Sequence, residues 1–144
     1  MTPARAQLAA SIEAIETEWL RTPIVWGVSD CLMSALAVLR QHGFDFDPFK
    51  HGRWTTALGY RRVLKRAGFA ALDDAIAWEA KAMGLRELDR GDHGEPGDLG
   101  IIPHEIGRSC VLSKGNGFWV GRRADYALAT RPTKVVVRAW RVLP

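Results

Sequence analysis

The sequence is poor in cysteine and has no long apolar run. Its 144 residues include two cysteines, Cys31 and Cys110, which are too few for a disulfide framework and lack the spacing of metal ligands. No stretch approaches 18 consecutive apolar residues, the minimum for a membrane-spanning helix. The polar, amphipathic start also lacks the pattern of a signal peptide. We therefore expect one soluble domain, residues 1–144, made in a reducing cytoplasm and without a cofactor, a metal or a membrane span.

Charge of one sign is not concentrated in long blocks. The net charge is +4 and the isoelectric point about 9.4, with the densest basic cluster, four residues in six, at Arg61 to Arg66. Such a cluster is typical of the solvated face of a helix, and the alternative is a surface for an acidic partner or nucleic acid. Nucleic acid is disfavoured as a partner, because this interpretation rests on modest charge alone; it would predict steeply salt-dependent binding.

Hydrophobic periodicity predicts helices in the first half of the chain. Thr2, followed by Pro3, is expected to cap the first helix. One face of that helix carries apolar residues at spacings of four, three and four: Leu8, Ile12, Ile15 and Trp19. A second helix, over about 32–41, is apolar around most of its circumference and is expected to be central and buried. Two more helices are expected, over 56–68 and 72–84.

Strand patterns fill the second half, after a loop rich in Gly, Asp and Pro over 88–98. Strands are expected over 99–102, 109–113, 118–121, 126–129 and 134–142. The "KGNG" segment between the second and third of these predicts a hairpin. Helices first and antiparallel strands afterwards predict an α+β domain.

Cys31 directly follows Asp30 at the expected start of the second helix. A helix N-terminus stabilises a thiolate through unpaired amide groups and the aligned peptide dipoles, which makes Cys31 a candidate nucleophile. The alternative is a small residue that packs in the core. Asp30 is expected to cap the helix, and as a member of a site its charge would oppose formation of the thiolate.

Three motifs, "PIVWGVSDC", "EPGDLGII" and "SCVLSKGNGFWV", occur in the order found in NlpC-type, papain-like cysteine peptidases, and the chain resembles this family over about residues 20–125. These peptidases cut bacterial cell-wall peptides. The positions that match the family's Gly-x-x-Asp-Cys and Pro-Gly-Asp motifs are Gly27, Asp30, Cys31, Pro96, Gly97 and Asp98. The resemblance implies N-terminal helices packed on a C-terminal antiparallel sheet or small barrel.

The resemblance also implies that the catalytic base is missing. A thiol nucleophile needs an imidazole to accept its proton and later return it. The position of the family's histidine falls at Ser109, and the polar residue that orients it would lie near Trp119 or Val120, in an apolar segment. His104, on the loop before Ser109, is the candidate replacement base. The alternative is that His104 is an exposed histidine without a catalytic role.

The remaining candidates are weaker. Cys110 is expected to face Cys31 across the site, where a disulfide is the alternative to two free thiols. His42 is one helix length from Cys31, too far to act on its thiol. The other two histidines, His51 and His93, lie in polar loops and are expected to be solvated. Of the six tryptophans, Trp26 and Trp54 are expected to pack rather than to stack on a ligand.

The segments "HGRWTTALGYRRVLKRAG" and "RAWRV" extend the likeness to small papain-like domains encoded with the tails of phages, prophages and gene-transfer agents. This resemblance implies a structural protein of the tail tip or baseplate, located in the virion and contacting other tail and baseplate proteins. The tryptophans and the Arg61–Arg66 cluster are its candidate contact surfaces. The alternative is an active endopeptidase or amidase that cuts cell-wall peptides during genome delivery, with Cys31 as nucleophile and His104 as base.

Overall fold

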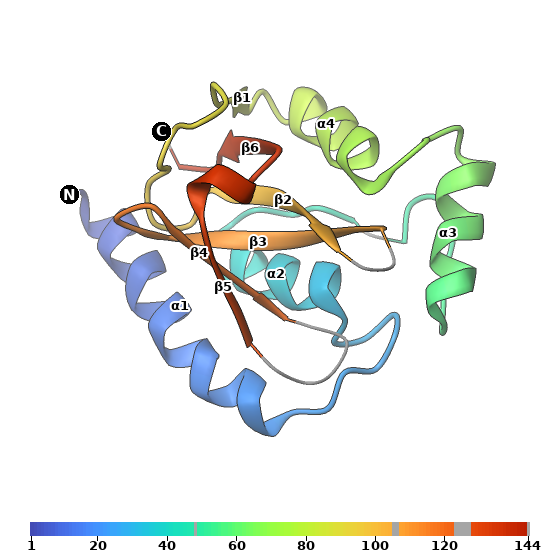
Figure 1. Cartoon of the computed structure of the whole chain (residues 1–144), viewed down its shortest axis with the longest axis horizontal. Coiled ribbons are helices and arrows are strands. Elements are labelled where there is room, and N and C mark those ends of the chain that lie inside the picture. The colour runs from blue at the N-terminus through green and yellow to red at the C-terminus, as the bar shows by residue number, and fades with distance from the viewer. Residues whose placement is uncertain (48, 105–106, 123–127, 144) are drawn as a thin grey trace.

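Four helices precede an antiparallel six-stranded sheet in the computed structural model (Figure 1), so the predicted α+β class is confirmed. The structure describes residues 1–47, 49–104, 107–122 and 128–143, without the side chains of residues 104, 128 and 129. The helices are α1 (Pro3–Arg21), α2 (Cys31–Arg40), α3 (Ala57–Arg66) and α4 (Leu72–Ala82). The strands are β1 (Arg86–Glu87), β2 (Leu99–His104), β3 (Gly107–Gly115), β4 (Phe118–Arg122), β5 (Leu128–Pro132) and β6 (Arg138–Arg141).

All four predicted helices are confirmed, and side-chain caps set where three of them begin. Thr2 caps α1 by accepting a hydrogen bond from the Arg5 amide at 3.2 Å, and Thr56 caps α3 in the same way. In the predicted apolar stripe of α1, Leu8, Ile12 and Trp19 are buried and Ile15 is half-buried. Helix α2 is buried along most of its length and packs against β3 and β4, as its apolar circumference predicts.

The strands pair in the order β1-β6-β2-β3-β4-β5, every pair antiparallel. The predicted hairpin joins β3 to β4, and its turn contains Asn116 at a φ of 57° between two glycines of positive φ. One face of the sheet packs against α1, α2 and α4 in the main core. The other face holds a smaller core around Trp119 and Val111. In Figure 1, α3 lies at the far side of the molecule from α1.

Two predictions about the strands are corrected. Residues 134–142 do not form one strand, because the chain has to pass from β5 at one edge of the sheet to β6 beside β2. A 3-10 helix, Thr133–Val135, makes this passage and places Val136 in the smaller core. The short strand β1 carries no apolar alternation, and the sequence did not reveal it. In the described part of the chain β1 and β5 do not pair with each other, so the arrangement is an open sheet rather than a closed barrel.

The expectation that the tryptophans form a contact surface is wrong for most of them. Trp19, Trp54, Trp119 and Trp140 are all buried. The charged side chains of the Arg61–Arg66 cluster are exposed, as expected for a solvated helix face. None of the helices in the described ranges is both long and apolar enough to cross a membrane.

Candidate functional site

Cys31 is held at the start of α2 by a clamp built on the Asp30 carboxylate. Its Oδ1 accepts a hydrogen bond from the Met33 amide at 2.9 Å, and its Oδ2 accepts from the Gly27 amide at 2.7 Å and the Trp54 indole at 2.8 Å. Gly27 is required here, because its φ is 82° and a Cβ would lie 2.0 Å from the Trp54 carbonyl oxygen. The predicted cap is therefore confirmed, and it also fixes the preceding loop.

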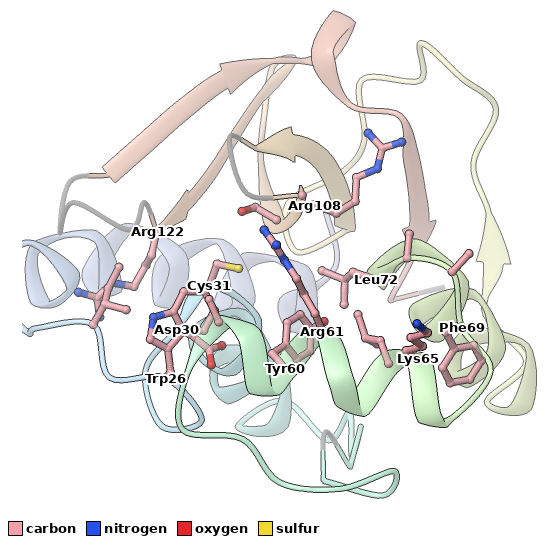
Figure 2. Close-up of a pocket in the computed structure, with 17 residues that line it drawn as sticks. Trp26, Asp30, Cys31, Tyr60, Arg61, Lys65, Phe69, Leu72, Arg108 and Arg122 are labelled. Carbon is pink, nitrogen blue, oxygen red and sulfur yellow. The ribbon is translucent and has the colours of Figure 1, made fainter.

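A cleft of about 710 Å³ opens beside Cys31. Figure 2 shows α3 running along one side of this cleft, with Cys31 and Arg108 across from it. Apolar side chains supply much of the lining, among them Ile24, Trp26, Leu64, Phe69 and Leu72. The basic lining residues are Arg61, Lys65, Arg108 and Arg122. A volume of this size is within the range of ligand-binding sites, about 300–1,000 Å³.

Burial raises the pKa of the Cys31 thiol from its ordinary value of 9.0. Hydrogen bonds with the Cys110 backbone and the Ser109 side chain lower the pKa but do not offset this effect, and the charge of Asp30 raises it further. Desolvation thus outweighs the helix N-terminus, and the thiol is protonated at neutral pH. Burial likewise raises the pKa of Cys110 well above 9.0, and both cysteines are free thiols.

Ser109, the position expected for the family's histidine, lies beside Cys31 at the start of the buried part of β3. Its hydroxyl is one of the groups that lower the pKa of the thiol, but a hydroxyl does not accept a proton at neutral pH. Neither of the two positions expected for the orienting residue supplies a polar group to the cleft. Trp119 is fully buried in the smaller core on the other face of the sheet, and Val120 is buried in the main core.

No histidine side chain of the described residues lines the cleft. The Nε2 of His42 is 2.8 Å from the Ser11 hydroxyl, and the Nδ1 of His93 is 3.2 Å from that of Thr133. The ring of His51 packs edge-on against two aromatic rings. The backbone of His104 ends β2, but its side chain lies outside the described residues, so its predicted role as a base stays a prediction. Within the described ranges no three His, Cys, Asp or Glu side chains are grouped as metal ligands.

The Pro96-Gly97-Asp98 motif is not part of the cleft lining. Asp98 is fully buried and accepts hydrogen bonds from the Glu95 amide at 2.7 Å and from the Arg141 guanidinium at 2.8 Å. Arg5 of α1 donates to the Pro96 carbonyl at 2.9 Å and lies 3.5 Å from Asp98. This motif joins the first helix, the loop before β2 and the last strand, and its role is to stabilise the fold.

Two lining residues were not recognised from the sequence as site residues. Tyr60 lies on the face of α3 that also carries Arg61 and Leu64, and only this helical spacing could have connected it with the basic cluster. The guanidinium of Arg122, on β4, donates to the carbonyl oxygens of Trp19 and Thr22. Burial lowers the pKa of Arg122. No sequence pattern connects β4 with the end of α1, because only the packing of the helix on the sheet brings them together.

Comparison with known proteins identifies a family of unestablished function. The model of the domain of unknown function DUF6950 matches residues 4–142, which is nearly the whole chain. No curated protein matches the sequence. No solved structure matches the fold.

Proposed function

The chain belongs to the DUF6950 family, and from this premise we propose that it is a structural component of a phage or phage-like tail tip or baseplate. In this proposal its fold is a papain-like, NlpC-type fold that has lost peptidase activity. The cleft beside Cys31 then binds a neighbouring protein without cutting it. Its place is in the virion, among other tail and baseplate proteins.

The observation that carries the loss of activity is the pairing of Cys31 with Ser109. A cysteine peptidase needs a low thiol pKa and a nearby imidazole. Here burial and Asp30 both raise the pKa of the thiol, and the side chain opposite it is a hydroxyl. Asp30 also has its oxygens bound to three donors of its own clamp, which leaves it a structural role.

The order of elements supports the NlpC-type assignment. A cysteine that begins a buried helix, followed by an antiparallel sheet entered through Pro-Gly-Asp, is the arrangement that the family resemblance implies. The contact of Ser109 with Cys31 supports the same assignment, since this is the position at which the family places its histidine. The tail-tip location rests on the sequence resemblance alone.

The test is complementation in the genome that encodes the protein. Deleting the gene should remove assembled tails or tail tips from electron micrographs, and a wild-type copy should restore them. A Cys31→Ala copy should restore both particle number and infectivity to the wild-type level, because the thiol has no chemical role. Normal tails in the deletion strain would refute the structural role.

The same strains decide the alternative of a peptidase with Cys31 as nucleophile and His104 as base. In that case Cys31→Ala would restore assembly but not infectivity, because particles would form and fail to deliver the genome. An equal loss of infectivity in His104→Ala would then identify the base. Full infectivity of both variants supports a cleft that only binds.

A further inference from the structure

Among the described residues, the lining of the Cys31 cleft is mainly basic, and the one carboxylate in it is already engaged. Four of the described lining residues are Arg or Lys, whereas one of them, Asp30, is acidic and has its oxygens bound to three donors. Arg108 is 3.7 Å from Asp73 on α4, but Lys65 has no ion-pair partner in the described part of the chain. The lining therefore favours an anion.

The cleft also contains a buried hydroxyl that lacks a partner. The Tyr60 hydroxyl is inaccessible to solvent and makes no hydrogen bond within the described ranges. Burial raises its pKa well above 10.0, and the charge of Asp30 raises it further, so the phenol is neutral and able to donate. Buried polar groups are nearly always hydrogen-bonded, and this exception points to an acceptor supplied by a ligand.

The arrangement of charges limits the shape of that ligand. The guanidinium of Arg122 is turned to backbone carbonyls, so we consider the other three basic residues of the lining. In Figure 2, Arg61 and Lys65 lie along α3 and Arg108 lies across the cleft from them. Cations spread in this way suit several separated acceptors better than a single head group. The apolar side chains between them, including Trp26 and Leu72, suit a ligand with apolar groups rather than a polyphosphate.

We propose that the cleft binds an extended peptide segment of a partner protein in which acidic and apolar residues alternate. An oxygen of this segment accepts the hydrogen bond of Tyr60, its carboxylates lie near Lys65 and Arg108, and its apolar side chains contact the walls. This inference rests on the proposed function, because it requires a cleft that holds a peptide without cutting it. The mode of recognition is charge complementarity over an apolar surface.

The test measures binding of two fluorescein-labelled pentapeptides, LELDL and its neutral analogue LQLNL, to the full chain by fluorescence polarisation. The acidic peptide should bind at least about tenfold more tightly, and the difference should shrink as salt is raised. Equal affinities, no binding, or displacement of the peptide by dodecanoate at lower concentration than by unlabelled LELDL would overturn the proposal.

Three variants locate the site. Lys65→Glu should weaken LELDL binding about tenfold, whereas Arg62→Glu, the same charge change on α3 outside the lining, should change it less than about twofold. Tyr60→Phe should weaken binding about threefold to tenfold without lowering the melting temperature, because it removes a hydroxyl that has no partner in the free protein. Equal effects of the two charge changes, or a Tyr60→Phe variant that binds normally, would contradict the assignment.

Failure of the proposed function has a different signature. Mass spectrometry of LELDL after incubation would detect cleavage that Cys31→Ala abolishes, and this would refute the inactive fold while leaving the measured preference for acidic peptide intact.

Discussion

At the scale of the residue, Cys31 shows that position in a helix does not by itself activate a thiol. Its place at the N-terminus of α2 favours the thiolate, but the side chain is desolvated and Asp30 adds a like charge. The pKa is raised as a result. The chemistry of the site is thus set by what surrounds the sulfur and not by the motif that contains it.

This pKa predicts slow alkylation of Cys31 in the folded protein. With iodoacetamide, the rate should follow a titration whose midpoint lies above 9.0, because only the thiolate reacts and burial suppresses it. The rate is measured across pH by mass spectrometry of the peptide that contains Cys31. In denaturant the midpoint should return to the ordinary thiol value.

A reactive plateau below about pH 8 in the folded state would refute the raised pKa.

The raised pKa of Cys31 also predicts how the free energy of unfolding depends on pH. Just above pH 9.0 the unfolded chain loses thiol protons that the folded chain keeps, so the free energy of unfolding should fall as the pH rises through this window.

At the scale of the element, α2 depends on one carboxylate for its start. Asp30 satisfies the Met33 amide of the first turn, the Gly27 amide of the loop before it and the Trp54 indole from a segment 24 residues later. An ordinary cap satisfies only amides of its own helix. The first turn of α2 is therefore fixed by tertiary contacts as well as by local ones.

Asp30→Ala should lower the free energy of unfolding by about 3 kcal/mol, since it removes the cap and leaves the buried Trp54 indole and the partly buried Gly27 amide without an acceptor. The matched control is Thr56→Ala on α3, whose side chain accepts only from the Gly59 amide, at 2.9 Å, at an exposed site. That change should cost about 1 kcal/mol. Denaturant unfolding measures both, and equal losses would show that Asp30 acts as a simple cap.

At the scale of the whole molecule, the two ends of the chain meet at the loop before β2. Arg5 donates to the carbonyl oxygens of Pro96 and Leu143, while Asp98 receives the Arg141 guanidinium of the last strand. Gly97 lies directly under α1, at a φ of 92°, where a Cβ would be 1.9 Å from Leu8. These contacts join the first helix to the loop before β2 and to the last strand, β6.

Gly97→Ala should therefore lower the free energy of unfolding by about 3 kcal/mol, from backbone strain and overpacking against Leu8 together. Gly91 separates the two causes, because its φ is 91° but a Cβ there would meet nothing within 4 Å. Gly91→Ala should cost only about 1 kcal/mol. If the two variants, compared by denaturant unfolding, lose the same amount, the contact of α1 with this loop contributes nothing.

Sequence patterns were sufficient to predict the features that depend on interactions between residues close together in the chain. Thr2 and Asp30 cap helices as expected, and the glycines around Asn116 form the expected turn, because these features depend on hydrogen bonds and backbone angles within a few residues. The interruption before β6 was not predictable in this way. Apolar residues at 135–137 are compatible with a strand, and only the position of β6 between β1 and β2 requires the chain to turn there.

The sequence by itself determined the helices, the hairpin, the α+β class and the placement of a cysteine at a helix start, since each follows from periodicity and from contacts between near neighbours. The resemblance already placed Ser109 at the site of this cysteine. The tertiary structure alone decided that Tyr60 and Lys65 share its cleft, and that the Pro-Gly-Asp motif joins the first helix to the last strand. Such pairings depend on how α3 and the sheet pack around α2, and the spacing of residues along a chain does not specify the desolvation that this packing produces.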